Sequence, residues 1–220
     1  MRSLVMSIVV LVLALFVCPV RAEFPTPSAY PISWELAFEW ATPRRIAVVV
    51  PNEKQPQAYW YMTYRVTNTT GTEQQFLPFF EMLTEDGRII RSDKNVPDAV
   101  FAAIKERERS KYLEPPEKIA GTIRVGEDQA VDSVAVWLEP AREMGRFSIF
   151  ASNLSGESVI MLKTDAGYVT VKKGEELVGL KDPELLVLRK TLQANYIILG
   201  DEVFPGEDEV NENPNEWIMR

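Results

Sequence analysis

The sequence predicts a mainly β protein, an antiparallel β-sandwich with one short helical insertion at about residues 97–111. Three observations support this fold class. Residues 59–90, YWYMTYRVTNTTGTEQQFLPFFEMLTEDGRII, place an aromatic and β-branched run before an Asn-Thr-Thr-Gly turn, and a second apolar run before a Glu-Asp-Gly turn. Strand-like segments continue at near-regular intervals as far as residue 199, separated by Gly, Asn, Asp and Pro. One segment alone has the composition of a convincing helix.

The first predicted strands come before and within this run. Residues 34–40 alternate strictly: four apolar side chains from Trp34 to Trp40 share one face, and Glu35 and Glu39 share the other. Residues 46–50 form the next strand. Residues 59–68 carry large side chains on both faces, so we expect this strand in the middle of a sheet, with its outer face covered.

The polypeptide returns along residues 76–84, which are predicted to form the next strand. Gly87 then supplies a positive φ for the turn into residues 88–91.

The predicted helix covers residues 97–111. Pro97 suits a first turn, and Asp98 suits the positive end of the helix dipole. Val100, Phe101 and Ile104 form a short apolar stripe, followed by solvated charge. We expect this helix to plug one open end of the sandwich.

Further strands are predicted over residues 119–125, 133–138, 146–151, 159–162 and 168–171. The last stretch, 185–199, is either one bent strand or a strand pair without an obvious turn. The sandwich domain then spans residues 32–200. A proline-rich linker at 23–31 precedes it, and an acidic, flexible tail at 201–220 follows it.

The N-terminal residues have the features of a secretory signal peptide. Arg2 gives a positive start, residues 4–17 are apolar apart from Ser7, and Val20-Arg21-Ala22 matches a cleavage site after Ala22. The expected location is therefore the periplasm, the cell surface or the exterior, with no membrane span in the mature chain. The alternative is an uncleaved anchor, although the apolar run is short for a span of roughly 20 residues.

Composition excludes several function classes. The chain has no histidine, and its one cysteine, Cys18, lies in the signal segment, so the commonest general base and the commonest zinc ligands are missing. The formal net charge is −8, which disfavours nucleic acid and anionic membrane surfaces as partners. No Gly-X-Ser-X-Gly elbow or phosphate-binding glycine loop is present. A Ser-Lys pair leaves no mark in sequence.

Carboxylates provide two candidate sites. Glu35 and Glu39 are about 13 Å apart along one strand, too far for a glycosidase pair, and alternation alone explains them. Glu127, Asp128 and Asp132 flank a loop and are weak calcium candidates, although their spacing matches no known calcium loop. The alternative for these three residues is a polar hairpin connection.

Aromatic side chains provide the remaining candidate. Tyr59, Trp60, Tyr61 and Tyr64 on one strand either form a stacking platform for sugars or belong to the core, and strand periodicity favours the core. Asn68 and Asn153 begin Asn-X-Ser/Thr sequons, which we interpret as turn residues.

The run YWYMTYRVTNTTG followed by FLPFFEMLTEDGRII resembles the opening strands of bacterial extracellular immunoglobulin-like domains of unknown function. Residues 33–200, with VPDAVFAAIKERE, SVAVW, FSIFASNLSGE and VLRKTL, also resemble uncharacterised secreted proteins of planctomycete-type bacteria. The resemblance implies an exported immunoglobulin-like β-sandwich with a helical insertion. It implies no activity, cofactor or site residue.

These observations favour a non-catalytic, exported binding or scaffold module that needs no cofactor and has a protein or glycan partner in the envelope. A carbohydrate- or calcium-binding module is the alternative. An enzyme with a carboxylate or Ser-Lys centre is the third hypothesis.

Overall fold

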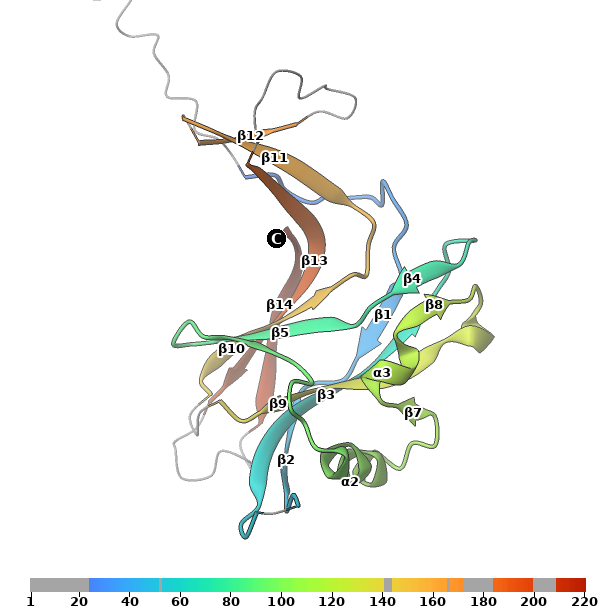
Figure 1. Cartoon of the computed structure of the whole chain (residues 1–220), viewed down its shortest axis with the longest axis vertical. Coiled ribbons are helices and arrows are strands. Elements are labelled where there is room, and N and C mark those ends of the chain that lie inside the picture. The colour runs from blue at the N-terminus through green and yellow to red at the C-terminus, as the bar shows by residue number, and fades with distance from the viewer. Residues whose placement is uncertain (1–23, 52, 141–143, 166, 172–183, 200–208) are drawn as a thin grey trace, which may run out of the picture. The chain divides into compact units, whose positions relative to one another are not determined.

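The computed structural model describes residues 24–51, 53–140, 144–165, 167–171, 184–199 and 209–220. Within these residues the protein is mainly β, with several antiparallel sheets (Figure 1). The described chain divides into a larger unit, Thr26–Val159 with Val187–Arg220, and a smaller one that contains Ile160–Leu186. The predicted signal segment and its cleavage site after Ala22 lie outside the described residues.

The first sheet of the larger unit is built around a long central strand. Its strands are β1 (Ala37–Trp40), β2 (Arg44–Val48), β3 (Gln57–Thr67), β7 (Leu113–Glu114) and β9 (Val131–Leu138). Strand β3 pairs antiparallel with β1, β2 and β9, and β7 joins the far side of β9 in parallel. The prediction that residues 59–68 lie in the middle of a sheet is confirmed.

The larger unit contributes five strands to the second sheet: β5 (Phe79–Thr84), β6 (Ile89–Arg91), β10 (Arg146–Ser152), most of β13 (Leu185–Ile198) and β14 (Val210–Met219). All of their pairings are antiparallel, in the order β14, β13, β10, β5, β6. Gly87, with φ of +84°, makes the predicted turn between β5 and β6.

Smaller elements connect the sheets. Strands β4 (Gln74–Phe76) and β8 (Gly121–Ile123) form a separate antiparallel pair. The helices are α2 (Asp98–Glu108), the short α3 (Pro116–Ile119) and the 3-10 helix η1 (Glu127–Gln129). Residues 76–84 and 119–125 were each predicted as one strand, but each divides between two elements. Pro78 separates β4 from β5 and cannot donate a ladder hydrogen bond, and Pro116 starts α3.

One hydrophobic core receives side chains from both sheets. The contributors from β3 are Trp60, Met62, Tyr64 and Val66. Facing residues come from the second sheet: Phe80 and Met82 on β5, Phe147 and Ile149 on β10, and Leu192, Ala194 and Tyr196 on β13. The predicted apolar face of residues 34–40 also packs here, with Leu36 buried and the other three partly buried. Strand alternation therefore orients this core as the sequence predicts.

A second, smaller core lies on the opposite face of the first sheet. Tyr59 and Tyr61 of β3 and two valines of β9 are covered there by Val100 and Ile104 of α2. Figure 1 shows α2 beside β2 and β3. The prediction that the helix plugs an open end is wrong: α2 covers the sheet face, because the outward side chains of β3 are aromatic and need burial.

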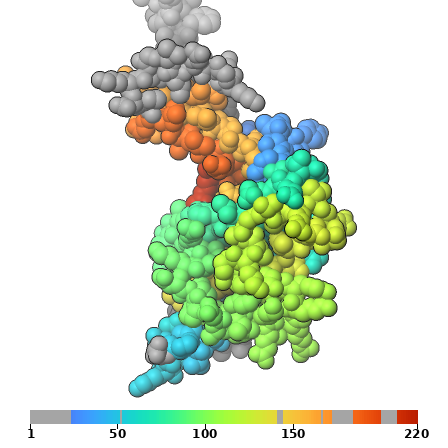
Figure 2. All heavy atoms as spheres, turned by 45° about the vertical axis from the view of Figure 1, so that its right-hand side comes forward, coloured from blue at the N-terminus to red at the C-terminus, as the bar shows by residue number. Residues whose placement is uncertain are grey.

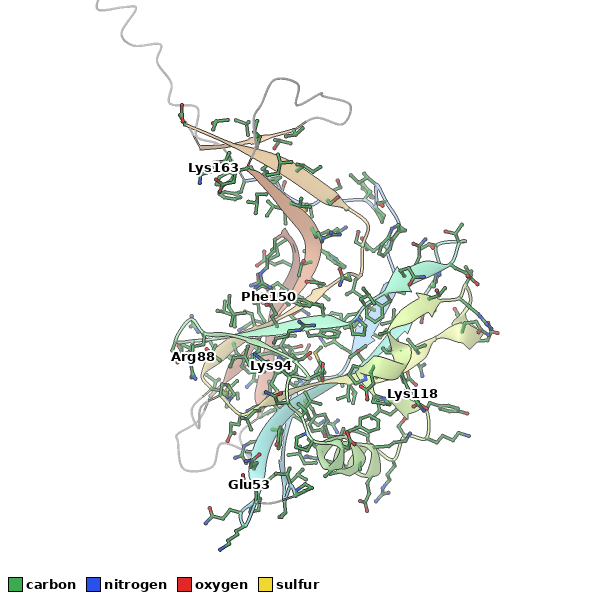
Figure 3. All side chains as sticks on the ribbon, viewed as in Figure 1. Glu53, Arg88, Lys94, Lys118, Phe150 and Lys163 are labelled. Atoms are coloured by element: carbon green, nitrogen blue, oxygen red, sulfur yellow. The ribbon has the colours of Figure 1, made fainter. Side chains whose placement is uncertain are left out.

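The C-terminal residues correct the prediction of a flexible acidic tail. Residues 210–219 form β14, which pairs with β13 along its length, and Trp217 packs against the main core. Most other residues of β14 are exposed, and its side chains are polar on both faces, as on many edge strands. Such a strand has the same composition as a flexible tail, which is why the sequence predicted one. Arg220 then pairs with Glu81 at 2.5 Å and lies 4.1 Å from the ring centroid of Phe150, labelled in Figure 3. Residues 201–208 lie outside the described residues.

The stretch 185–199 forms the single strand β13 rather than a strand pair. Strands β11 (Ser158–Thr164) and β12 (Gly167–Thr170) form an antiparallel hairpin, in agreement with the two strands predicted there. In the smaller unit an exposed ion pair joins Lys163 to Glu184 at 2.9 Å. No helix in the described parts of the chain is long and apolar enough to cross a membrane.

Candidate functional site

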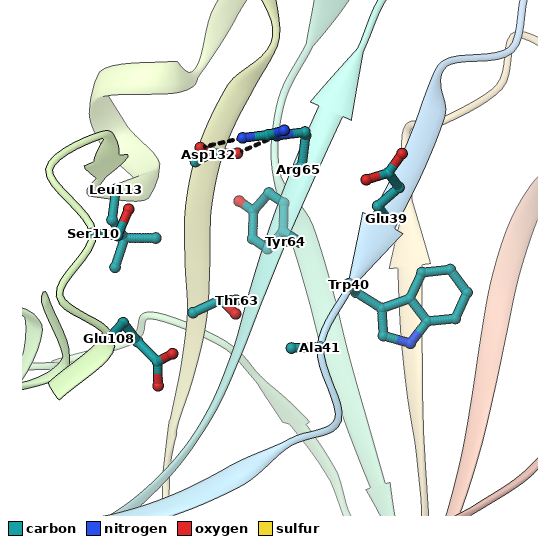
Figure 4. Close-up of a pocket in the computed structure, with 10 residues that line it drawn as sticks. All are labelled: Glu39, Trp40, Ala41, Thr63, Tyr64, Arg65, Glu108, Ser110, Leu113 and Asp132. Atoms are coloured by element: carbon teal, nitrogen blue, oxygen red, sulfur yellow. Dashed lines mark hydrogen bonds and ion pairs between the residues drawn. The ribbon is translucent and has the colours of Figure 1, made fainter.

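A pocket of about 370 Å³ opens on the outer face of the first sheet, next to the end of α2 (Figure 4). Strands β1, β3 and β9 supply one side, and the segment from Glu108 to Leu113 supplies the other. The lining residues are Glu39, Trp40, Ala41, Thr63, Tyr64, Arg65, Glu108, Ser110, Leu113 and Asp132. All of them belong to the larger unit.

A row of charged side chains crosses three strands of this sheet. Glu39 on β1 is opposite Arg65 on β3, and Arg65 is opposite Asp132 on β9. Alternation along β3 turns Arg65 away from the main core, in which Tyr64 and Val66 are buried. Arg65 donates two hydrogen bonds to Asp132, from Nε at 2.6 Å and from Nη2 at 2.8 Å, a bidentate geometry that fixes both groups.

Glu108, the last residue of α2, is also held in place. It accepts a 2.6 Å hydrogen bond from the Tyr61 hydroxyl and a 3.1 Å hydrogen bond from Nη1 of Arg44. Burial, reinforced by the bond to Glu108, raises the pKa of Tyr61 to about 12, so this hydroxyl remains a donor at neutral pH. Arg109 ends the helix in the left-handed conformation, with φ of +51°, and the chain turns along the pocket edge.

The residues that line the pocket are mainly polar and charged. Three carboxylates and one guanidinium line it, and only Glu39 has no ion pair within the described residues. Ser110 and Thr63 contribute hydroxyl groups, but neither side chain hydrogen-bonds a described carboxylate or lysine that would act as a base. The volume lies at the lower end of the range for small-ligand pockets, enough for one side chain or a small molecule.

The calcium candidates do not come together. Glu127 and Asp128 lie on η1, whereas Asp132 lies in β9 and is bound to Arg65. Asp128 accepts a hydrogen bond from its neighbour Gln129. Across the described ranges, no group of three or more His, Cys, Asp or Glu side chains is close enough to hold a metal ion.

The aromatic platform for sugars is excluded by burial. Trp60 and Tyr61 are each 1% exposed, and Tyr59 and Tyr64 are also buried. Trp60 and Tyr64 enter the main core, and Tyr59 and Tyr61 enter the core under α2. The two-sided core interpretation of these aromatics is confirmed.

Glu35 and Glu39 separate in the fold. Glu39 faces the pocket, whereas Glu35 lies 2.8 Å from the ammonium of Lys190, which also lies near Glu157. Sequence reasoning missed Lys190 and Glu157. The available signal was the position of Lys190 at strand period between two leucines, Leu188 and Leu192, in the run LLVLRKTLQANYIIL. Among the described residues, no lysine ammonium hydrogen-bonds a serine hydroxyl, so no Ser-Lys pair is formed there.

Comparison of the chain with protein-family models, with curated proteins and with solved structures found no match.

Proposed function

We propose that this protein is an exported, non-catalytic binding module with an immunoglobulin-like β-sandwich fold. Its pocket beside α2 takes a positively charged group from an envelope partner. Support for the sandwich comes from two mainly antiparallel sheets that share one core. Support for export comes from the apolar segment that precedes Ala22.

The observation that carries the binding proposal is the pre-positioned charge of the pocket. Arg65 and Asp132 satisfy each other, and Glu108 is held by Tyr61 and Arg44. Glu39 lies opposite Arg65 on the neighbouring strand and is the exposed lining carboxylate that forms no ion pair among the described residues, so it can pair with a ligand. A lysine or arginine side chain matches both the charge and the size of the pocket. Little reorganisation is needed on binding, because the neighbouring groups are already fixed.

The test is a titration of the whole chain, followed by amide NMR, with acetyl-lysine amide, acetyl-arginine amide and uncharged acetyl-glutamine amide. Saturable shifts centred on Ala41, Thr63 and Arg65 with the two cations, and none with the glutamine compound, are expected. Glu39→Gln should weaken binding by about two- to fivefold, in line with an exposed charge–charge contact. Glu53→Gln is the matched control, since Glu53 is exposed at the β2–β3 tip and remote from the pocket (Figure 3). Equal responses to all three compounds would contradict the proposal.

A further inference from the structure

Lys190 on β13 is an almost fully buried cation, 3% exposed. Its ammonium lies 2.8 Å from Oε2 of Glu35 and 3.7 Å from Oε2 of Glu157, and 4.9 Å from the ring centroid of Trp217. Glu157 is 5% exposed. Lysine and glutamate are rarely buried to this extent unless they are paired, so the burial of these two side chains depends on their contact with each other and with Glu35.

The cluster is not balanced in charge. Two carboxylates share one ammonium: Oε2 of Glu35 is paired with it at 2.8 Å, whereas Oε2 of Glu157, at 3.7 Å, accepts no hydrogen bond from the described residues. Partly satisfied buried ionic groups add little to stability, and removal of one partner leaves an uncompensated charge. The best-attested use of such a group is to specify one arrangement of chain segments.

The segments that meet at the cluster are far apart in sequence. Glu157 accepts a 2.8 Å hydrogen bond from the backbone N–H of Ser28, and its own carbonyl accepts one from Lys190 N at 3.0 Å. Gly156 N donates to Trp34 O at 3.0 Å, just before Glu35. Residues 28–34 form no helix or strand of their own, so these hydrogen bonds and the packing of Trp34 against the main core are what attach them.

Residues 29–33, between these attachments, are exposed to solvent. Tyr30 is 83% exposed and Ile32 is 74% exposed. Figure 2 shows the N-terminal described residues (blue) at the surface, beside the turn that follows β3 (teal). A segment with few buried apolar contacts and a small set of anchoring bonds belongs to the low-stability end of a structure.

The missing side chain of Gly156 leaves the space that residues 33 and 34 occupy. A Cβ at this position would lie 2.3 Å from Nε1 of Trp34 and 2.5 Å from Oγ of Ser33. The backbone of Gly156 is not in the left-handed region, so alanine is conformationally acceptable there. Gly156→Ala therefore pushes against residues 28–34 and leaves every charge of the cluster in place.

We infer that residues 28–34, which contact the main core only through Trp34 at their C-terminal end, form a strap that opens as a unit without unfolding of the two cores. The Lys190–Glu35–Glu157 cluster is the latch that keeps the strap closed. The strap is a conformational device separate from the pocket beside α2. Loss of the latch cation, or loss of space at Gly156, shifts the strap to its open state by two unrelated routes.

The test is native-state hydrogen exchange on the whole chain, with amide-resolved NMR of Ser28, Gly156 and Leu36. Lys190→Met keeps the chain length and apolar stem of the lysine but removes its charge. Gly156→Ala is the second variant. Lys118→Met is the control, because Lys118 forms an exposed pair with Glu114 at 2.8 Å in the same unit (Figure 3).

In both test variants the Ser28 amide is expected to exchange at least about tenfold faster than in the parent protein. The core amides of β3 and β9 should not share this acceleration. Lys118→Met should match the parent. Unchanged exchange at Ser28 in Gly156→Ala would overturn the inference. It would also be overturned if strap and core amides accelerated by the same factor, since the strap would then open only with the whole domain.

Discussion

Replacement of Asn68 by alanine is expected to destabilise the larger unit by about 3 kcal/mol, although Asn68 lies in a polar turn. Its side chain is fully buried and makes four hydrogen bonds. Nδ2 donates to Thr72 O at 2.8 Å and to Ile123 O at 2.9 Å. Oδ1 accepts from the N–H of Thr70 at 3.0 Å and from its hydroxyl at 2.8 Å. One amide therefore ties the β3 turn to β8.

The magnitude follows from these four bonds. Each is worth about 1 kcal/mol net, giving an upper value near 4 kcal/mol. The Thr70 and Thr72 groups are partly exposed and regain water, whereas the Ile123 carbonyl is left buried without this partner, at about 1–3 kcal/mol. Asn68→Asp should cost at least as much, because it loses both donors and places a carboxylate against two carbonyl oxygens.

Urea unfolding followed by tryptophan fluorescence measures this change, with the free energy of unfolding taken from the midpoint and slope. Asn153→Gly is the matched control. Asn153 heads the other sequon, has φ of +64°, and its side chain makes one exposed bond, to Leu77 O at 2.9 Å. Glycine tolerates that φ, so a change within about 1 kcal/mol is expected. If Asn68→Ala lowers the free energy of unfolding by less than about 1 kcal/mol, the proposed role of this amide in holding the turn to β8 is wrong.

Three further predictions concern burial and backbone conformation. Burial raises the pKa of Asp93 to about 6 from its ordinary 3.8. The folded state therefore binds this proton more tightly, and the Asp93 contribution to stability is lost as pH rises from about 4 through 6; Asp93→Asn should remove that slope from a series of melting temperatures. Trp60→Ala should cost about 3–5 kcal/mol by urea unfolding, whereas Trp60→Phe should cost clearly less, because the Trp60 Nε1–H is buried and hydrogen-bonds no described residue. Gly87→Ala should cost about 1 kcal/mol from its φ of +84° alone, since no atom lies within 4 Å of the added Cβ; a thermal melt unchanged from the parent would contradict this.

The pocket and the strap owe their geometry to contacts that no local pattern specifies. Glu39 and Glu35 have the same sequence signature, yet one faces the pocket and the other faces Lys190, because regular pairing of β1 begins only at Ala37 and Glu35 bridges instead to Ser155. Asp132 was a calcium candidate from its neighbours in sequence. Its register opposite Arg65 on β3 makes it an ion-pair partner.

The sequence by itself determined the local elements: the alternation of residues 34–40, the two-sided strand at 59–68, the turn at Gly87 and a helix near 97–111. These follow from side-chain periodicity and from backbone freedom at single residues, which act over a few residues. Only the tertiary structure decided that α2 covers a sheet face, that residues 210–219 complete a sheet, and that Lys190 meets Glu35 and Glu157. Those outcomes depend on pairing between segments that are far apart in sequence. The position of α2 follows from the need to bury aromatic side chains, and the Lys190 cluster follows from the need of a buried charge for a partner.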